Sequence, residues 1–123
     1  MSITTEYDIQ ATVIEWAEWK KNKYPCLKLM YHTPNEGKRA PATGANLKRI
    51  GMKPGVPDIC LPVARGGYHA LYIELKTEDG SLSKEQKDYL HALDLEGNCT
   101  YVCRSAIDAI KRIELYITGG ERI

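Results

Sequence analysis

The sequence lacks an excess of charge of either sign. Its 17 lysines and arginines face 16 aspartates and glutamates, which gives a formal net charge of +1 at pH 7. Bulk electrostatics therefore indicate neither a nucleic-acid nor a membrane partner, and any such signal must be local. No uninterrupted apolar run approaches the roughly 20 residues of a membrane span. Residues 1–6 have neither the basic nor the apolar region of a secretory signal. We therefore expect a cytoplasmic protein without a membrane partner.

Clustered cysteines and histidines are also missing. The cysteines at positions 26, 60, 99 and 103 contain no CxxC pair, and the three histidines are scattered. A four-cysteine zinc site is the alternative to free thiols. Free and mostly buried thiols fit a reducing compartment better.

The overall composition is that of a globular chain, with 43% hydrophobic and 27% charged residues among 123. This length is typical of one domain. It leaves no room for separate substrate and cofactor domains. We therefore predict a single domain over 1–123 and no nucleotide cofactor.

Hydrophobic periodicity and turn residues predict the order helix, three strands, helix, strand, helix. The predicted elements are a helix at 6–20, strands at 27–32, 56–63 and 69–76, a helix from Ser83 to Gly97, a strand at 99–103 and a helix after Ser105. Thr4 or Thr5 is expected to cap the first helix. Residues 33–55 form a long connection, interrupted by a short helix around 45–50, and a loop of this length is usually functional or mobile.

The turn at 65–67 and the later crossover predict the sheet. Arg65-Gly66-Gly67 joins the second and third strands as an antiparallel hairpin. A helix separates the third and fourth strands, which can therefore pair in parallel. The expected fold class is α/β, a mixed sheet flanked by helices.

Functional side chains gather on one face of the predicted hairpin. Strand alternation places Asp58 on the same face as Cys60, and Tyr72, Glu74 and Lys76 together on one face of the next strand. Two carboxylates and an ammonium in one small area are costly without a compensating ion. Metal-assisted phosphodiester hydrolysis uses such a set, with carboxylates holding Mg²⁺ and a lysine orienting the attacking water. The carbonyl of Leu75 could supply a further ligand.

The same residues carry a resemblance to a known family. Pro57-Asp58, fifteen residues and then Glu74-Leu75-Lys76 resembles the PD-(D/E)xK nuclease signature. Together with 51–58, 72–76 and 80–86, it is similar to the virus-type replication-repair nuclease (VRR-NUC) domain from about Glu6 to the last helix. The resemblance implies a restriction-endonuclease-like fold with a mixed central sheet.

The resemblance also implies residue roles and partners. Asp58 and Glu74 are expected to bind Mg²⁺ or Mn²⁺, with Lys76 as the catalytic lysine and Gln86 as a supporting site residue. The family resembles archaeal-type Holliday junction resolvases. It therefore implies a structure-specific DNA endonuclease that acts on branched DNA such as Holliday junctions or flaps, in DNA repair, and a homodimer.

The family pattern expects an acidic residue on the first helix, and helix geometry selects one. At about 100° per residue, Glu6 and Gln10 fall within or beside the apolar face, whereas Glu15 and Glu18 do not. We choose Glu6 as a further metal ligand and Gln10 as its neighbour, in contact with DNA. The helix dipole is the alternative reason for a first-turn acid.

Gln86 also has two interpretations. Ser83-Lys84-Glu85-Gln86 matches a capping box, in which the glutamine reaches back to the cap backbone. Gln86 nevertheless shares the helix face of Leu90 and Leu93, which points toward the sheet. A role in the site and a role in capping therefore both stay open.

Local charge predicts the DNA contact. The connection at 33–55 carries five basic residues against the single acid Glu36. The predicted phosphate contacts are Lys38, Arg39, Lys48, Arg49 and Lys53, with Asn35 added at the start of the loop. A solvated loop is the alternative. Because no base-reading motif is present, phosphate and shape recognition are favoured.

Several alternatives stay open on the sequence. The fold can serve as a catalytically inactive DNA-binding module, as a sequence-specific or less structure-selective phage endonuclease, or as an RNA-processing nuclease. Trp19 and the apolar residues of the final helix are candidate dimer contacts. Core packing explains the latter, Ile110, Ile113, Tyr116 and Ile117, equally well.

Overall fold

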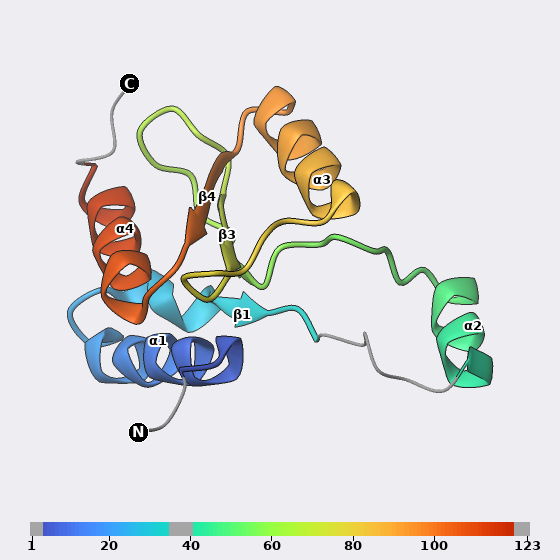
Figure 1. Cartoon of the computed structure of the whole chain (residues 1–123). Coiled ribbons are helices and arrows are strands. Elements are labelled where there is room, and N and C mark those ends of the chain that lie inside the picture. Colours follow the sequence, from blue (N-terminus) through green and yellow to red (C-terminus); the bar gives the residue numbers. More distant parts are fainter. Residues whose placement is uncertain (1–3, 35–40, 120–123) are drawn as a thin grey trace.

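The structure, a computed structural model, describes residues 4–34 and 41–119, with the backbone alone at 41–44 (Figure 1). The elements are α1 (Glu6–Lys20), a 3-10 helix η1 (Pro25–Leu29), β1 (Tyr31–His32), α2 (Pro41–Arg49), β2 (Ile59–Leu61), β3 (Leu71–Leu75), α3 (Lys84–Leu95), β4 (Cys99–Cys103) and α4 (Ala106–Thr118). None of the helices in this described part is long and apolar enough to cross a membrane.

The strands form one mixed sheet in the order β1-β2-β3-β4. The pairs β1–β2 and β2–β3 are antiparallel, and β3 and β4 run in parallel. The predicted hairpin, the predicted parallel pair and the α/β class are therefore confirmed. In β2–β3 the register pairs Ile59 with Ile73 and Cys60 with Tyr72, which fixes the face on which each side chain lies.

Helices cover both faces of the sheet (Figure 1). The face formed by Ile59, Ile73 and their in-phase neighbours packs with α1 and α4 in the hydrophobic core. The core includes Ile113 and Tyr116 of α4, so core packing accounts for these two residues. Trp19 of α1 is 87% exposed. The other face of the sheet, which carries Tyr72 and Glu74, lies on the side of α3.

Short polar side chains begin the three long helices as the sequence predicts. Thr5 and Asp8 form a reciprocal capping box at α1. Ser83 caps α3, and the Ser105 hydroxyl accepts a hydrogen bond from Asp108 N at 3.1 Å at α4. These caps satisfy backbone N–H groups that have no partner within the helix.

The predicted strand at 27–32 is wrong over most of its length. Residues Pro25–Leu29 form η1, in which Leu27 N donates to Tyr24 O at 3.0 Å, and Met30 N donates to Leu27 O at 3.2 Å. Only Tyr31–His32 pairs in the sheet. The reason is that Pro25 favours a helical start, and one buried leucine satisfies an alternating and a 3-10 pattern equally.

Two other boundaries differ from the predictions. The short helix begins at Pro41 and not near residue 45, since proline is favoured in a first helical turn. The second predicted strand shrinks to Ile59–Leu61, because Pro57 and Pro62 have no N–H for the ladder.

Among the described elements, α2 packs on no other helix or strand and stands apart from the body (Figure 1).

Candidate active site

The carboxylate of Asp58 is fixed at the end of the β2–β3 pair. Asp58 and Glu74 each lie one residue beyond the paired Ile59 and Ile73, on the face covered by α3. Asp58 Oδ2 accepts a hydrogen bond from Leu75 N at 2.7 Å, and Asp58 O accepts one from Thr33 N at 2.7 Å. The β1–β2–β3 ladder thus holds this carboxylate beside Glu74.

Glu74 is a buried carboxylate with one unsatisfied oxygen. Glu74 is 2% exposed, and it is the one charged residue among the buried residues of the described structure. Oε2 accepts a hydrogen bond from Gln86 Nε2 at 3.1 Å, whereas Oε1 is buried and has no hydrogen-bond partner. Such an atom loses its hydration without compensation, which is unfavourable unless another group satisfies it.

The environment of Glu74 disfavours its negative charge. Burial first, and then the nearby charge of Asp58, raise the pKa of the Glu74 carboxyl to about 8. Lys76 acts in the opposite direction, and Glu6 adds to the increase. A cation placed between the two carboxylates would reverse this balance. The orphaned oxygen and the adjacent carboxylate therefore fit a divalent cation.

Lys76 and Leu75 complete the end of β3. Lys76 is half-buried directly after the strand, and its N–H donates to Cys103 O of β4 at 3.0 Å. The Leu75 side chain lies in the core, and its backbone lies between the two functional side chains. The Leu75 carbonyl stays a predicted ligand.

Gln86 combines the two interpretations left open by the sequence. Its Oε1 accepts a hydrogen bond from Ser83 N at 2.9 Å, and its backbone N donates to Ser83 Oγ at 3.1 Å. The amide Nε2 meanwhile donates to Glu74. The same side chain caps α3 and orients the buried carboxylate.

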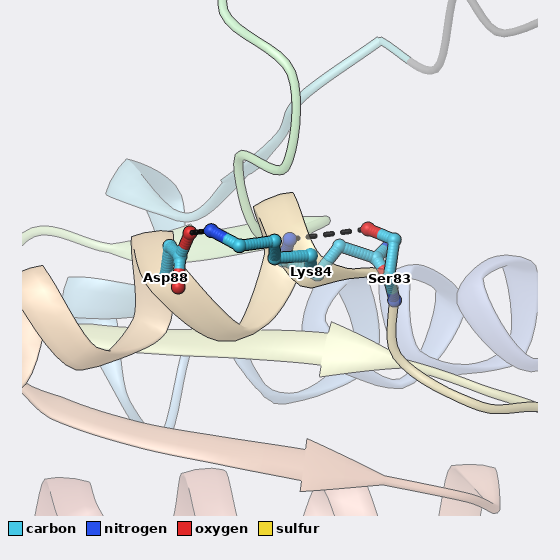
Figure 2. A network of polar contacts seen from close by, with 4 residues as sticks. Ser83, Lys84 and Asp88 are labelled. Atoms are coloured by element: carbon cyan, nitrogen blue, oxygen red, sulfur yellow. Dashed lines mark hydrogen bonds and ion pairs between the residues drawn. The ribbon is translucent and has the colours of Figure 1, made fainter.

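Lys84 and Asp88 lie along the exposed side of the same helix. Figure 2 shows Ser83 at the start of α3 and the ion pair between Lys84 Nζ and Asp88 Oδ2, at 2.7 Å. Both side chains are mostly exposed. Solvent screening makes such a pair weak. Lys84 is therefore a suitable control lysine for substitutions in the site.

Glu6 and Gln10 lie on α1, and both are half-buried. Glu6 is close enough to act on the pKa of Glu74. Within residues 4–34 and 41–119, no group of three or more His, Cys, Asp or Glu side chains is placed to hold a metal ion. Mg²⁺ is commonly bound by one or two carboxylates plus waters and phosphates, which the pair at Asp58 and Glu74 can provide. The ligand role of Glu6 stays a prediction.

The predicted DNA contacts are only partly described. Asn35, Lys38 and Arg39 lie outside the described residues. Lys48 and Arg49 end α2, Lys53 follows it, and all three are exposed. Their role in binding DNA also stays a prediction.

Gly55 allows the segment before Asp58 to pack closely on α3, and the sequence did not identify it as a site residue. Its φ is +84°, and a Cβ atom there would lie 2.4 Å from Glu85 O and 2.9 Å from Gln86 N. The segment before Asp58 therefore packs directly on the first turn of α3. The glycine of Gly-Val-Pro-Asp indicates a special backbone position, but only the fold shows that its neighbour is the backbone of Glu85 and Gln86.

Replacing Gly55 by alanine is expected to destabilise the protein and to displace Gln86 from Glu74. A side chain at positive φ costs about 1–2 kcal/mol, and forced overlap in a packed region adds about 1–3 kcal/mol. Gly67→Ala is the matched control, because Gly67 has φ +91° but no atom within 4 Å of its Cβ position. Urea unfolding measures both variants. Equal losses in the two would contradict the contact with α3.

Comparisons with known proteins identify the family of the chain. The family model of the VRR-NUC domain matches residues 4–107. A solved structure described as a "VRR_NUC domain protein" superposes with a TM-score of 0.82 and 31% sequence identity, and the match covers 100% of this chain and 96% of the other. A search of curated proteins finds no match. The chain therefore belongs to the VRR-NUC family, which implies a nuclease of the PD-(D/E)xK type.

Proposed function

We propose that this nuclease is a Mg²⁺- or Mn²⁺-dependent endonuclease that hydrolyses DNA phosphodiesters in branched DNA such as Holliday junctions or flaps. The observation that carries the proposal is the unsatisfied Oε1 of Glu74, buried beside Asp58 and next to Lys76. A protein keeps such an uncompensated group mainly where it has a function. The motif that these residues form supplies the reaction class.

Asp58 and Glu74 would hold the cation, with the carbonyl of Leu75 as a further donor. Glu6 would act as a further ligand through coordinated water, since no three acidic side chains of the described residues are placed to bind one ion directly. A bound divalent cation supplies Lewis-acid polarisation of the phosphate and lowers the pKa of a coordinated water. The hydrogen bond from Leu75 N orients Asp58, and the one from Gln86 orients Glu74. These contacts leave the remaining carboxylate oxygens available as ligands.

Lys76 would orient the attacking water and stabilise the developing negative charge on the scissile phosphate. Its charge acts to lower the pKa of Glu74, so the ammonium group is within electrostatic reach of this carboxylate. An ammonium group in a site with little water interacts with transition-state charge more strongly than it would in solution.

The basic residues of the connection between β1 and β2 would bind DNA phosphates on either side of the cleaved bond. Lys48, Arg49 and Lys53 are exposed, and α2 is not engaged in packing among the described elements. Lys38, Arg39 and Asn35 belong to the same connection, and Gln10 lies on α1 near Glu6. Such contacts position the substrate without reading its sequence.

Neutralising Lys48, Arg49 and Lys53 together is expected to weaken DNA binding and to reduce its salt dependence. Each lost contact to a duplex phosphate lowers the slope of log K against log salt by about 0.9. Fluorescence anisotropy with labelled duplex at several salt concentrations measures the slope. The charge-matched control is alanine at the exposed Lys28, Lys87 and Lys111. An equal effect of both triple variants would contradict a localised interface.

A substrate panel tests the proposed function directly. Labelled four-way junction, flap, linear duplex, single-stranded DNA and matched RNA are incubated with Mg²⁺, Mn²⁺ or a chelator. Cleavage of the branched DNAs in either metal, but not with chelator, supports the proposal. Cleavage of no substrate would overturn the activity, and preferred cleavage of duplex or RNA would overturn the substrate class.

The proposal includes a homodimer, because a two-fold dimer places two copies of the site at a fixed separation. Symmetric cutting of a four-way junction needs such an arrangement. Sedimentation analysis at the concentrations used for cleavage tests it. A monomer that cuts both junction strands independently would contradict this part.

A further inference from the structure

We propose that Arg104 is a positioning residue that clamps the turn after β3 and thereby holds the side chain of Lys76 in the site. The inference rests on the proposed role of Lys76 and adds a residue that lies outside the nuclease motif. Arg104 directly follows β4, the strand that pairs in parallel with β3.

The clamp consists of one guanidinium nitrogen and several backbone carbonyls. Arg104 Nη1 donates to Thr77 O at 2.9 Å, to Glu78 O at 3.4 Å and to Gly80 O. The turn is closed by Gly80 N, which donates to Thr77 O at 3.1 Å. Because these acceptors span the turn, the arginine fixes its shape and not only one end.

The clamped turn borders the Lys76 side chain. A Cβ atom at Gly80 would be 3.5 Å from Lys76 Cδ and 3.2 Å from Thr77 Oγ1. A methyl group at this position would thus be in ordinary van der Waals contact with Lys76 Cδ, so the turn runs alongside the aliphatic stem of the lysine. A shift of Gly80 would open space beside that stem, and the ammonium group would gain freedom.

The backbone of Lys76 is held by Cys103, the residue before Arg104. Lys76 N donates to Cys103 O at 3.0 Å. Residues 103 and 104 therefore fix the lysine at two places, first its backbone and then the turn that borders its side chain. Arginine suits this position because its guanidinium group is always charged and its Nη1 alone reaches three carbonyls of the turn.

A purely structural cap and a positioning residue predict different results for Arg104→Ala. If Arg104 positions Lys76, kcat falls at least about tenfold, since a small displacement of a catalytic group is enough for such a loss. KM stays within about twofold, because phosphate contacts are untouched. Arg104→Lys is expected to recover part of kcat, since an ammonium group can still donate to the carbonyls.

Arg65→Ala is the matched control. Arg65 also binds backbone carbonyls, with Nε donating to Ile117 O at 3.2 Å and Nη1 to Ala64 O at 2.8 Å, but it precedes β3. Its loss is expected to lower the melting temperature and to change kcat less than twofold. A tenfold loss of kcat in Arg65→Ala as well would overturn the assignment, since kcat would then follow stability.

A double-mutant cycle tests whether Arg104 acts through Lys76. In the Lys76→Ala background, Arg104→Ala is expected to leave the residual rate unchanged, because the group that it positions is absent. A further loss in that background, or an unchanged kcat in the single variant, would overturn the inference.

Amide hydrogen exchange separates the inference from the proposed function. Arg104→Ala is expected to speed exchange at 76–80 whether or not the chain cleaves DNA. If the wild-type chain cleaves nothing, the proposed function fails. Unchanged exchange at 76–80 would then overturn the clamp itself.

Discussion

Replacing Lys76 by alanine is expected to lower the cleavage rate by about 10²–10⁴-fold, the range typical for the loss of a positioned proton-transfer group. The reason is local. Lys76 is half-buried directly after β3, and its charge acts to lower the pKa of Glu74. Folding and DNA binding should persist, because its backbone N–H keeps its partner on β4.

Single-turnover cleavage, duplex anisotropy and a thermal melt measure the three properties separately. Lys84→Ala is the control, since Lys84 is a mostly exposed lysine on α3 whose ion-pair partner is Asp88 (Figure 2) and neither Asp58 nor Glu74. Equal cleavage by Lys76→Ala and the wild type would place the chemistry elsewhere. DNA binding by both with no cleavage by either would favour the inactive binding module.

The elements that frame the site could be predicted because their residues leave few choices. The alternation of 71–75 and the caps at Ser83 and Ser105 specify one strand and two helix starts. The segment at 25–32 could not be predicted in the same way, because a proline start and one buried leucine fit a 3-10 helix and a strand equally.

For the candidate site, the period-two pattern indicates correctly that Asp58 and Glu74 share a face. It does not show that Glu74 Oε1 lacks a partner, that Gln86 bonds both Ser83 and Glu74, or that Gly55 meets α3. These facts depend on how distant segments pack. A periodic pattern along one strand contains no information about that packing.

Replacing Glu74 by glutamine is expected to remove activity and, in the metal-free protein, to increase stability. The change removes a buried carboxyl that lies beside Asp58 and has one unsatisfied oxygen. Because its pKa is raised to about 8, this carboxyl must take up a proton near neutral pH or carry an unfavourable charge at higher pH. Relief of an unsatisfied buried polar group is worth about 1–3 kcal/mol. Cleavage should fall at least about 10²-fold, because a neutral amide is a weaker ligand than a carboxylate.

Thermal melts in chelator and in Mg²⁺ or Mn²⁺ separate these two effects. A cation that binds only the folded state stabilises it by RT ln(1 + [L]/Kd), so the wild type should melt higher in metal and the variant should not. Glu15→Gln is the control, since Glu15 is an exposed acid on α1. A variant that loses stability in chelator and still gains it in metal would contradict the assignment of Glu74 as a ligand.

The expected loss of activity and the expected gain of stability in Glu74→Gln follow from one property of the site. The fold places Glu74 next to Asp58 and gives one of its oxygens no donor. The metal-free protein must therefore either bind a proton at this carboxyl, whose pKa is raised to about 8, or keep its charge beside Asp58, and both cost free energy of folding. Glutamine needs no proton and carries no charge, so the substitution is expected to stabilise the metal-free chain and to disable it. An ordinary buried glutamate with a structural role would give the reverse, because its replacement would break a satisfied contact and lower the melting temperature with or without metal. The sign of the change in chelator thus distinguishes a ligand from a structural residue without any measurement of cleavage.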